Sequence, residues 1–388
     1  MRIAVLTTLL PLSTRPREGV FALRRWQHMR RRGHLLHVVH PLPWAPPGIG
    51  PRAWRELGAV GARETVEGLE VEHPRYVHLP GRHLANARRA AARGVAVALA
   101  GERPEVAIAD YAWPMALAAD ALAEAGVPFV VHGRGSDVLQ VAGEAGLAAP
   151  LAAALRRAGH WCAVSRDLLA RMDELGGAPG RGRLVANGVD TTTFHVRERG
   201  ACRARLGLPR EGALVLVVGH LIERKDPELA LAAFARLAER QPDARLAFVG
   251  RGPLEGALRE AARRLGLAER VTWAGEVAPE VLVDWYGAAD ALLLTSRREG
   301  RPNVVLEALA CGRPVLATAA GGTGELLEGL PGSLVETREP AALAEALARL
   351  LARPVDPLAL RARSAGFGWD ASCVALEACL REAVGGGA

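Results

Sequence analysis

Two glutamates eight residues apart are the first candidates for chemistry in this chain. Glu299 lies in a polar loop after a short apolar run, and Glu307 lies inside an expected short helix. The two carboxylates need not share a face of that helix, so they could bracket a ligand lying across its start. Each also has a plain structural interpretation, because acidic residues are common in loops and on solvated helix faces.

The expected helix start between the two glutamates is suited to an anion. Pro302 stands where the first helical turn would begin and Gly312 just beyond the last turn, which is the usual placement of these residues around a helix. Unpaired amides and the helix dipole favour negative charge at such a start, for example a diphosphate. The amides expected to face the anion are those of Gly300, Asn303 and Val304.

Lys225 is the only lysine among the 49 lysines and arginines of the chain. Arginine is a poor substitute for lysine where a compact point charge must fit a narrow pocket. By itself the single lysine is equally consistent with chance and with function.

Residues 299–325 follow the pattern E-G-x-P-N-x-x-x-E-A-x-A-x-G-x-P-V and then G-G-x-x-E. This long pattern resembles the retaining glycosyltransferases of family 4. Further matches lie in residues 19–21, 187–194, 217–225 and 249–253, so the resemblance covers nearly the whole chain. It implies an α/β protein of the GT-B class, with two Rossmann-like domains that face each other across a cleft.

The resemblance also implies a role for each matching residue. Glu299 would contact the transferred sugar, Glu307 the donor ribose, and Lys225 the donor phosphates. His220 stands where the family usually carries arginine, so Lys225 and the helix start would bear more of the phosphate charge. The donor-binding residues implied in this way are Gly19, His220, Lys225, Gly250, Gly252, Glu299, Gly300, Asn303, Val304 and Glu307.

The family's H-G-x-D motif has an ambiguous counterpart here. Residues 132–137 have the sequence H-G-R-G-S-D. Counting back from Asp137 places Arg134 at the position of the family's histidine, and His132 lies two residues earlier. Either side chain could donate to the sugar or the diphosphate, and His132 could equally end a core strand. The expected catalytic residues are therefore His132, Arg134, Lys225 and Glu299.

Short apolar runs alternate with amphipathic stretches along the chain. We expect strands at residues 3–7, 36–40, 106–110, 127–132, 161–165 and 183–187, and again at 214–219, 246–250, 271–273, 291–295, 314–318 and 333–336. Such alternation is typical of parallel sheets covered by helices. We therefore expect an acceptor-side Rossmann-like domain over residues 1–190, completed by a crossover helix at 370–388, and a nucleotide-sugar donor domain over 191–369. Residues 41–63, rich in Pro, Gly and Trp, are expected to form a long surface loop.

The net charge of +7 lies entirely in residues 1–190. Arg82, Arg89 and Arg93 are expected on one helical face, with Asp137 also assigned to the acceptor side. The helix at 19–32 is expected to carry a second basic face with five arginines. Such faces could meet a lipid-linked or other anionic acceptor, or an anionic membrane, although a charge run is more often simply solvated. Aromatic residues make up only 4% of the chain and no nucleic-acid motif occurs, so we expect no nucleic-acid partner.

The chain has five scattered cysteines, an odd number, which favours a reducing, cytoplasmic location. It also lacks an apolar run long enough to span a membrane. Contact with the inner face of the membrane would be peripheral, and the apolar start of the chain is expected to be a buried strand rather than a signal peptide. No Asp-x-Asp pair occurs, so we expect no metal. We also expect no cofactor besides the nucleotide-sugar donor, for which a UDP-sugar is the leading expectation.

These expectations describe a retaining, metal-independent transferase that passes a sugar to a hydroxyl acceptor in glycan, polysaccharide or glycolipid synthesis. Two alternatives remain open. One is a non-catalytic nucleotide-sugar-binding or scaffold subunit of a glycan assembly complex, and the other is an epimerase of the same fold. The sequence identifies neither the sugar, the base of the nucleotide nor the acceptor.

Overall fold

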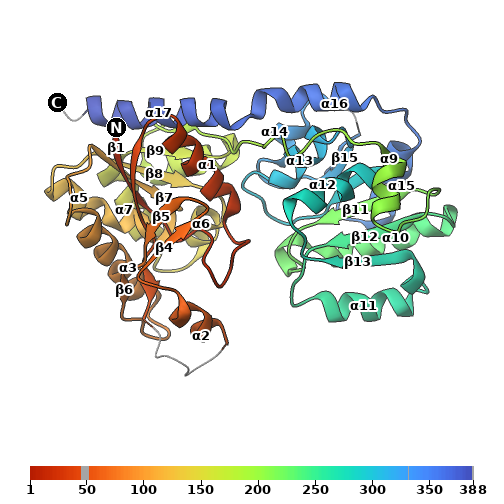
Figure 1. Cartoon of the computed structure of the whole chain (residues 1–388), viewed down its shortest axis with the longest axis horizontal. Helices are drawn as coiled ribbons and strands as arrows, with labels where there is room; N and C mark the ends of the chain where they lie inside the picture. The colour runs from red at the N-terminus through yellow and green to blue at the C-terminus, as the bar shows by residue number, and fades with distance from the viewer. Residues whose placement is uncertain (45–51, 331, 387–388) are drawn as a thin grey trace. The chain divides into compact units, whose positions relative to one another are not determined.

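The chain divides into two compact units, each built around its own parallel sheet (Figure 1). The computed structural model describes residues 1–44, 52–330 and 332–386. The first unit contains Met1–Gly188 together with Trp369–Ala388, and the second contains Val189–Gly368. Two α/β units with parallel sheets confirm the predicted fold class.

The sheet of the first unit has eight strands, and every neighbouring pair is parallel except β4 with β5. Successive residues of the central strands point to opposite faces, so Ile3 and Val5 enter one apolar cluster while Ala4 and Leu6 enter the other. The strands, in spatial order, are β10 (Arg183–Leu184), β9 (Gly159–Ala163), β8 (Phe129–Gly133), β7 (Val106–Asp110), β1 (Arg2–Leu6), β2 (Leu35–Val39), β5 (Leu69–Glu72) and β4 (Arg63–Val66).

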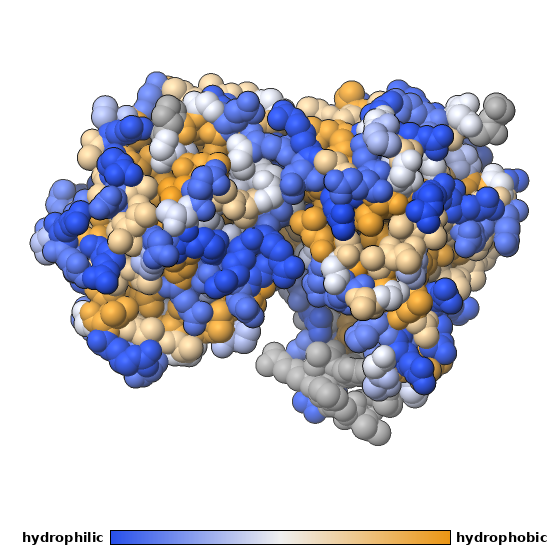
Figure 2. Space-filling view, turned by 180° about the vertical axis from the view of Figure 1, so that it is seen from behind, coloured by the Kyte–Doolittle hydropathy of each residue, from blue (hydrophilic) through white to orange (hydrophobic). Residues whose placement is uncertain are grey.

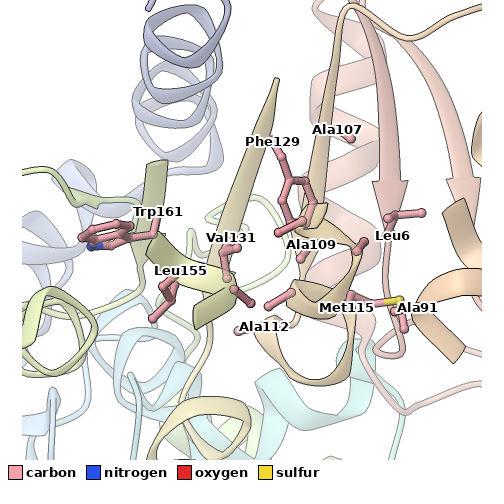
Figure 3. Close-up of a cluster of buried hydrophobic side chains, with 14 of the residues drawn as sticks. Leu6, Ala91, Ala107, Ala109, Ala112, Met115, Phe129, Val131, Leu155 and Trp161 are labelled. Atoms are coloured by element: carbon pink, nitrogen blue, oxygen red, sulfur yellow. The ribbon is translucent and has the colours of Figure 1, made fainter. Parts of the chain in front are cut away.

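Helices cover both faces of this sheet, which explains why its central strands are apolar throughout. Figure 3 shows part of one cluster, where side chains from β1, β7, β8 and β9 meet side chains from the covering helices. The helices of the first unit are α1 (Val20–Arg31), α2 (Arg52–Ala59), α3 (His83–Ala98), α4 (Ala112–Met115), α5 (Ala119–Glu124), α6 (Ser136–Leu139), α7 (Ala148–Ala158), α8 (Arg166–Gly176) and α17 (Trp369–Gly385).

The second unit has a six-stranded, fully parallel sheet. Its strands, in spatial order, are β13 (Val271–Gly275), β12 (Arg245–Val249), β11 (Leu214–Val218), β14 (Ala291–Leu294), β15 (Val315–Thr318) and β16 (Leu334–Val335). The helices are α9 (Arg199–Arg205), α10 (Pro227–Arg240), α11 (Glu255–Arg264), α12 (Pro279–Ala288), α13 (Asn303–Ala310), α14 (Thr323–Leu327), α15 (Pro340–Leu351) and α16 (Pro357–Ser364). Adjacent strands β11 and β14 end in neighbouring loops, because parallel strands finish at the same edge.

Helix α17 lies in the first unit. Its residues Cys373, Leu376 and Leu380 are buried in one cluster with Trp26 of α1 and with the sheet. An ion pair from Arg32 to Glu377, 2.6 Å from Nε to Oε1, adds a polar contact. The segment expected as a crossover helix thus begins at Trp369 and buries its apolar side within this unit.

The prediction of a long surface loop at residues 41–63 is wrong in part. The structure places a short strand, β3 (Leu42–Pro43), at its beginning and α2 near its end. Strand β3 pairs with β6 (Arg75–Tyr76). Residues 45–51 of the predicted loop lie outside the described residues.

The surface seen in Figure 2 is mainly hydrophilic, with apolar side chains in separate areas between the charged ones. Among the described residues, no helix combines the length and apolar character needed to cross a membrane.

Candidate functional site

Lys225 and Glu299 form an ion pair at the ends of adjacent strands. The Lys225 Nζ lies 2.5 Å from the Glu299 Oε1, and a nitrogen of Arg224 lies 3.8 Å from the other carboxylate oxygen. Lys225 ends a short 3-10 turn after β11, and Glu299 lies in the loop after β14. The Glu299 side chain is 6% exposed and that of Lys225 20%. The structure therefore brings together two residues that the sequence placed 74 positions apart.

Hydrogen bonds join the two loops that carry this ion pair. The Thr295 hydroxyl donates to the Asp226 carbonyl at 2.8 Å, and the Arg297 amide donates to the Arg224 carbonyl at 2.8 Å. Arg338 binds the Asp226 carboxylate and the Thr295 carbonyl, both at 2.7 Å. Sequence reasoning missed Asp226 and Arg338. Asp226 could have been found as the residue that caps α10 before Pro227, whereas nothing in the sequence singles out Arg338.

Helix α13 begins at Asn303, four residues after Glu299. Pro302 is the residue before the helix rather than its first residue, because its ψ of 110° is extended. Gly312 follows the helix with a φ of 69°, as its predicted position beyond the last turn requires. The positive end of the α13 dipole thus lies in the same loop as Glu299.

Glu307 lies one turn into α13 and binds a tyrosine. The Tyr286 hydroxyl donates to the Glu307 Oε2 at 2.8 Å and lies 3.3 Å from the Val304 carbonyl. Burial raises the pKa of Glu307 to about 7, and the bond from Tyr286 opposes this shift only in part. The carboxyl therefore titrates near neutral pH. Sequence reasoning did not foresee Tyr286, which lies on a different helix.

Close packing of the backbone leaves no room for a side chain at Gly250 and Gly252, two of the glycines expected around the donor. A Cβ at Gly250 would meet the Gly219 carbonyl oxygen at 2.0 Å, and one at Gly252 would meet the Leu221 carbonyl oxygen at 2.3 Å. These glycines let the loop after β12 lie directly against the loop after β11. His220, in the β11 loop, is exposed.

His132 and Arg134 are held in a buried charge network of the first unit. The Asp110 carboxylate accepts from Nε and Nη2 of Arg134 at 2.9 and 2.6 Å, and lies 3.0 Å from the His132 Nδ1. The Trp26 indole donates to the other Asp110 oxygen at 2.5 Å. Burial, together with the charges of Arg134 and Arg25, lowers the pKa of His132 to about 3 despite the nearby Asp110. At neutral pH this histidine is uncharged.

The prediction that Arg25 belongs to an exposed basic face of α1 is wrong, because this arginine is fully buried. Its Nη1 lies 3.0 Å from the His132 Nδ1, and its Nη2 donates to Asn187 at 3.1 Å and to Ser372 at 3.2 Å. Burial and the nearby Arg134 lower its pKa to about 9. The helix position alone suggested a surface arginine, because the partners that make its burial tolerable come from distant segments.

Asp137 and Gly19 hold backbone in place. The Asp137 carboxylate accepts from the amides of Ala112, Arg134 and Gly135 at 2.6, 2.9 and 2.7 Å. Burial raises the pKa of Asp137 to about 6 despite these bonds. Gly19 has a φ of 70° at the start of α1, and a Cβ there would meet the Leu9 carbonyl oxygen at 2.8 Å.

The arginines of α3 are exposed. Arg82, which precedes the helix, and Arg89 and Arg93 within it have no acidic partner among the described residues, and neither has Arg88. Residues 73–101 contain no aspartate or glutamate at all. This region therefore presents positive charge that the protein itself does not neutralise. Within the described ranges, no three histidine, cysteine or acidic side chains gather as metal ligands.

Comparison with known proteins agrees with this architecture. Residues 19–193 match the model described as Glycosyltransferase Family 4, and residues 212–353 match the model described as Glycosyl transferases group 1. The fold is similar to that of a sucrose-phosphate synthase from Thermosynechococcus elongatus, with a TM-score of 0.79, 20% identity and full coverage of both chains. It is also similar to Anabaena HepE in complex with UDP, with a TM-score of 0.75 and 20% identity over 98% of this chain and 100% of that one.

Curated relatives are more similar in sequence. A D-inositol 3-phosphate glycosyltransferase of Frankia alni is 40% identical over 221 residues, 53% of this chain and 54% of that protein. One from Acidothermus cellulolyticus is 35% identical over 277 residues, 68% of this chain and 59% of that protein. The chain spans about half the length of the first of these relatives.

The two parallel-sheet units define a protein of the GT-B class, and the candidate site loops follow β11 and β14 of the second unit. The chain belongs to glycosyltransferase family 4.

Proposed function

We propose that this protein is a retaining, metal-independent glycosyltransferase that moves a sugar from a nucleoside-diphosphate sugar, with UDP-sugars as the first candidates, to a hydroxyl acceptor. The observation that carries the proposal is the pairing of Lys225 with Glu299 beside the start of α13. A cation and a helix start suit a diphosphate, and a neighbouring carboxylate suits sugar hydroxyls.

In this reaction the bond from the anomeric carbon to the donor phosphate breaks, and the nucleoside diphosphate leaves with the bonding electrons. Lys225 and the first amides of α13 stabilise the charge that develops on the leaving oxygen. Glu299 positions the sugar, and Glu307 accepts from a ribose hydroxyl. The acceptor hydroxyl attacks from the side that the phosphate leaves, and its proton passes to the departing phosphate, so no protein base is assigned.

The network around Asp110 supports a positioning role for the first unit. His132 is neutral and Arg134 is fixed by two bonds to Asp110. The His132 Nδ1 faces Asp110, which takes up the one N–H of a neutral imidazole. We therefore assign His132 and Arg134 to positioning within the first unit, and acceptor contacts to the exposed arginines near α3.

The unneutralised positive charge near α3 further suggests an anionic acceptor. We propose a lipid-linked acceptor, reached by peripheral contact of Arg82, Arg89 and Arg93 with an anionic, cytoplasm-facing membrane surface. Exposed Val77 and Leu79 just before α3, at 59% and 39% exposure, add apolar contact area.

The function is tested by nucleotide binding followed by product analysis. UDP, GDP and ADP are compared by thermal shift, and the UDP-sugars or their equivalents are then incubated with a panel of lipid and soluble acceptors. Sugar transfer with release of the nucleoside diphosphate supports the proposal. Binding without turnover would favour a scaffold subunit, an isomerised donor would indicate an epimerase, and binding of none of the nucleotides would refute all three.

A further inference from the structure

Arg338 lies between β16 and α15, after the last of the sequence motifs, which ends at residue 325. Its guanidinium contacts four acceptors. Nη2 donates to the Asp226 Oδ2 and to the Thr295 carbonyl, both at 2.7 Å. Nη1 donates to the Ser296 carbonyl at 3.1 Å and lies 3.4 Å from the Thr318 hydroxyl.

Three of these acceptors belong to the two loops that carry the candidate site, and the fourth, Thr318, ends β15. Asp226 directly follows Lys225, while Thr295 and Ser296 lead into the loop of Glu299. One planar, charged group therefore joins both loops at once. A lysine could not do the same, because an ammonium group lacks the fixed fork of donors that spans separate acceptors.

Arg338 also contacts the side chain of a residue in a left-handed turn, Asp226. Its φ of 47° and ψ of 57° lie in the left-handed region, which few residues other than glycine adopt. Its carboxylate is held by Arg338 at 2.7 Å, by Arg297 at 2.8 Å and by the Leu229 amide at 3.3 Å. The turn at Asp226 directly follows Lys225, so Arg338 holds the backbone next to the candidate phosphate-binding residue.

We propose that Arg338 is a positioning residue of the donor site, whose guanidinium holds the Lys225 loop and the Glu299 loop at the separation that a bound diphosphate requires. The inference rests on the proposed function, since it assigns the site to a nucleotide. It adds a residue that contacts neither the phosphates nor the sugar and acts through its two neighbours.

The test measures UDP affinity by isothermal titration calorimetry and transfer kinetics in the full chain. Arg338→Ala should weaken UDP binding and lower kcat/KM by roughly 10- to 100-fold, because small displacements of binding groups carry costs of that order. Guanidinium chloride, added well below denaturing concentrations, should restore much of the UDP affinity by occupying the vacated position. Methylammonium chloride at equal concentration should not.

Two arginines serve as matched controls. Arg297 binds the same Asp226 oxygen but neither strand-end carbonyl, so Arg297→Ala should lose less affinity and show no rescue by guanidinium. Arg349 is 68% exposed on α15 and pairs with Glu345 of the same helix. Arg349→Ala should bind UDP like the wild type.

An Asp226→Gly background separates positioning from general stability. Glycine adopts the left-handed turn without help, so Arg338→Ala should cost less affinity in that background than in the wild type. If Arg338→Ala does not fold, Arg338→Lys takes its place, with weakened UDP binding again expected.

The inference is overturned if Arg338→Ala, or Arg338→Lys in its place, binds UDP with wild-type affinity. It is equally overturned if affinity is lost but guanidinium rescues nothing and the Asp226→Gly background changes nothing. Failure of the proposed function looks different, because the wild-type chain itself would then bind none of UDP, GDP and ADP.

Discussion

Lys225 is the residue on which the proposed chemistry depends most directly. Lys225→Ala removes the cation from the leaving diphosphate and should lower kcat by about 10²–10³-fold. Lys225→Arg should also be impaired, because a planar fork needs different space from an ammonium group. Steady-state kinetics with circular dichroism as a fold check measure both effects.

Arg224 provides the control for this prediction. It is the neighbouring residue and lies 3.8 Å from the same glutamate, but its side chain is 37% exposed. Arg224→Ala should therefore have a much smaller effect on kcat. Equal losses for the two alanine variants, or normal kinetics for both Lys225 variants, would remove Lys225 from the mechanism.

Glu307 predicts a pH dependence of nucleotide binding. With a pKa of about 7, its ionised fraction rises about tenfold between pH 6 and pH 8. A ribose hydroxyl donates best to the carboxylate, so UDP affinity should rise with pH by up to that factor. Isothermal titration calorimetry across this pH range measures the effect. In Glu307→Gln the part of the pH dependence that comes from Glu307 should disappear, and only the part that comes from protonation of the UDP phosphates should remain.

Folding stability should respond to the same group in the opposite direction. The pKa of Glu307 is raised above its ordinary value of 4.5 by burial, so the folded protein binds this proton more tightly than the unfolded chain. The associated stability is present below about pH 4.5 and is lost as the pH rises through 7. Without nucleotide, the slope of unfolding temperature against pH should therefore differ between the wild type and Glu307→Gln.

Some residues of the candidate site could be predicted from the sequence and others could not, for physical reasons. Glu299, Glu307 and Lys225 lie in local patterns, and the structure places Lys225 against Glu299. Arg338 and Tyr286 act across the fold, and their sequence neighbours are ordinary. A helical pattern likewise gave no sign that Arg25 is buried, because its partners Asn187 and Ser372 are 162 and 347 residues away.

At the scale of single elements, the region of α3 predicts binding to anionic lipid. Reversing Arg82, Arg89 and Arg93 to glutamate should weaken sedimentation with phosphatidylglycerol-containing vesicles, since each charge near such a surface contributes about 1 kcal/mol. The loss should be largest at low salt. UDP affinity should hardly change, because the proposed nucleotide contacts lie in the second unit.

Helix α11 offers a matched control of three arginines. Arg259, Arg263 and Arg264 are exposed, but each lies within ion-pair distance of Glu255 or Glu260. Reversing these three should leave vesicle sedimentation unchanged. If the wild-type protein does not sediment with anionic vesicles at low salt, the membrane proposal is refuted and a soluble acceptor is favoured.

The strands that sequence reasoning found are those whose apolar runs are buried on both faces, such as β7 and β11. The hairpin of β4 and β5 was missed, because its residues 63–72 alternate apolar with charged side chains and lack a long apolar run. Its turn uses Glu67 and Gly68 at φ values of 44° and 82°. A turn with two positive φ values is more easily recognised when asparagine or glycine occupies the first position.

At the scale of the whole molecule, two separate cores predict two unfolding transitions. In differential scanning calorimetry, UDP should raise only the transition of the second unit, by about 2.7 kcal/mol of added stability at one hundred times its dissociation constant. Glu377→Gln should lower only the other transition. A single transition that both perturbations shift together would contradict this assignment.

Glu377 also gives that transition a pH dependence. Its bond to Arg32 lowers its pKa to about 2, with a further contribution from His34. The depressed pKa means that the associated stability is present above the ordinary carboxyl value of 4.5 and is lost as the pH falls toward 2. Glu377→Gln should flatten this acid limb for the first unit alone.

The placement of α17 has a consequence for how the chain is made. Residues 189–368 are continuous, whereas the first unit needs both the start of the chain and residues 369–385. Domains generally fold as they emerge from the ribosome, the N-terminal one first. Here the second unit can finish folding before α17 has been synthesised. Until then the apolar side of α1 lacks its contacts with Cys373, Leu376 and Leu380. A nascent chain stalled before residue 369 would therefore carry a complete second unit and an uncovered apolar face, a form suited to recognition by chaperones and proteases.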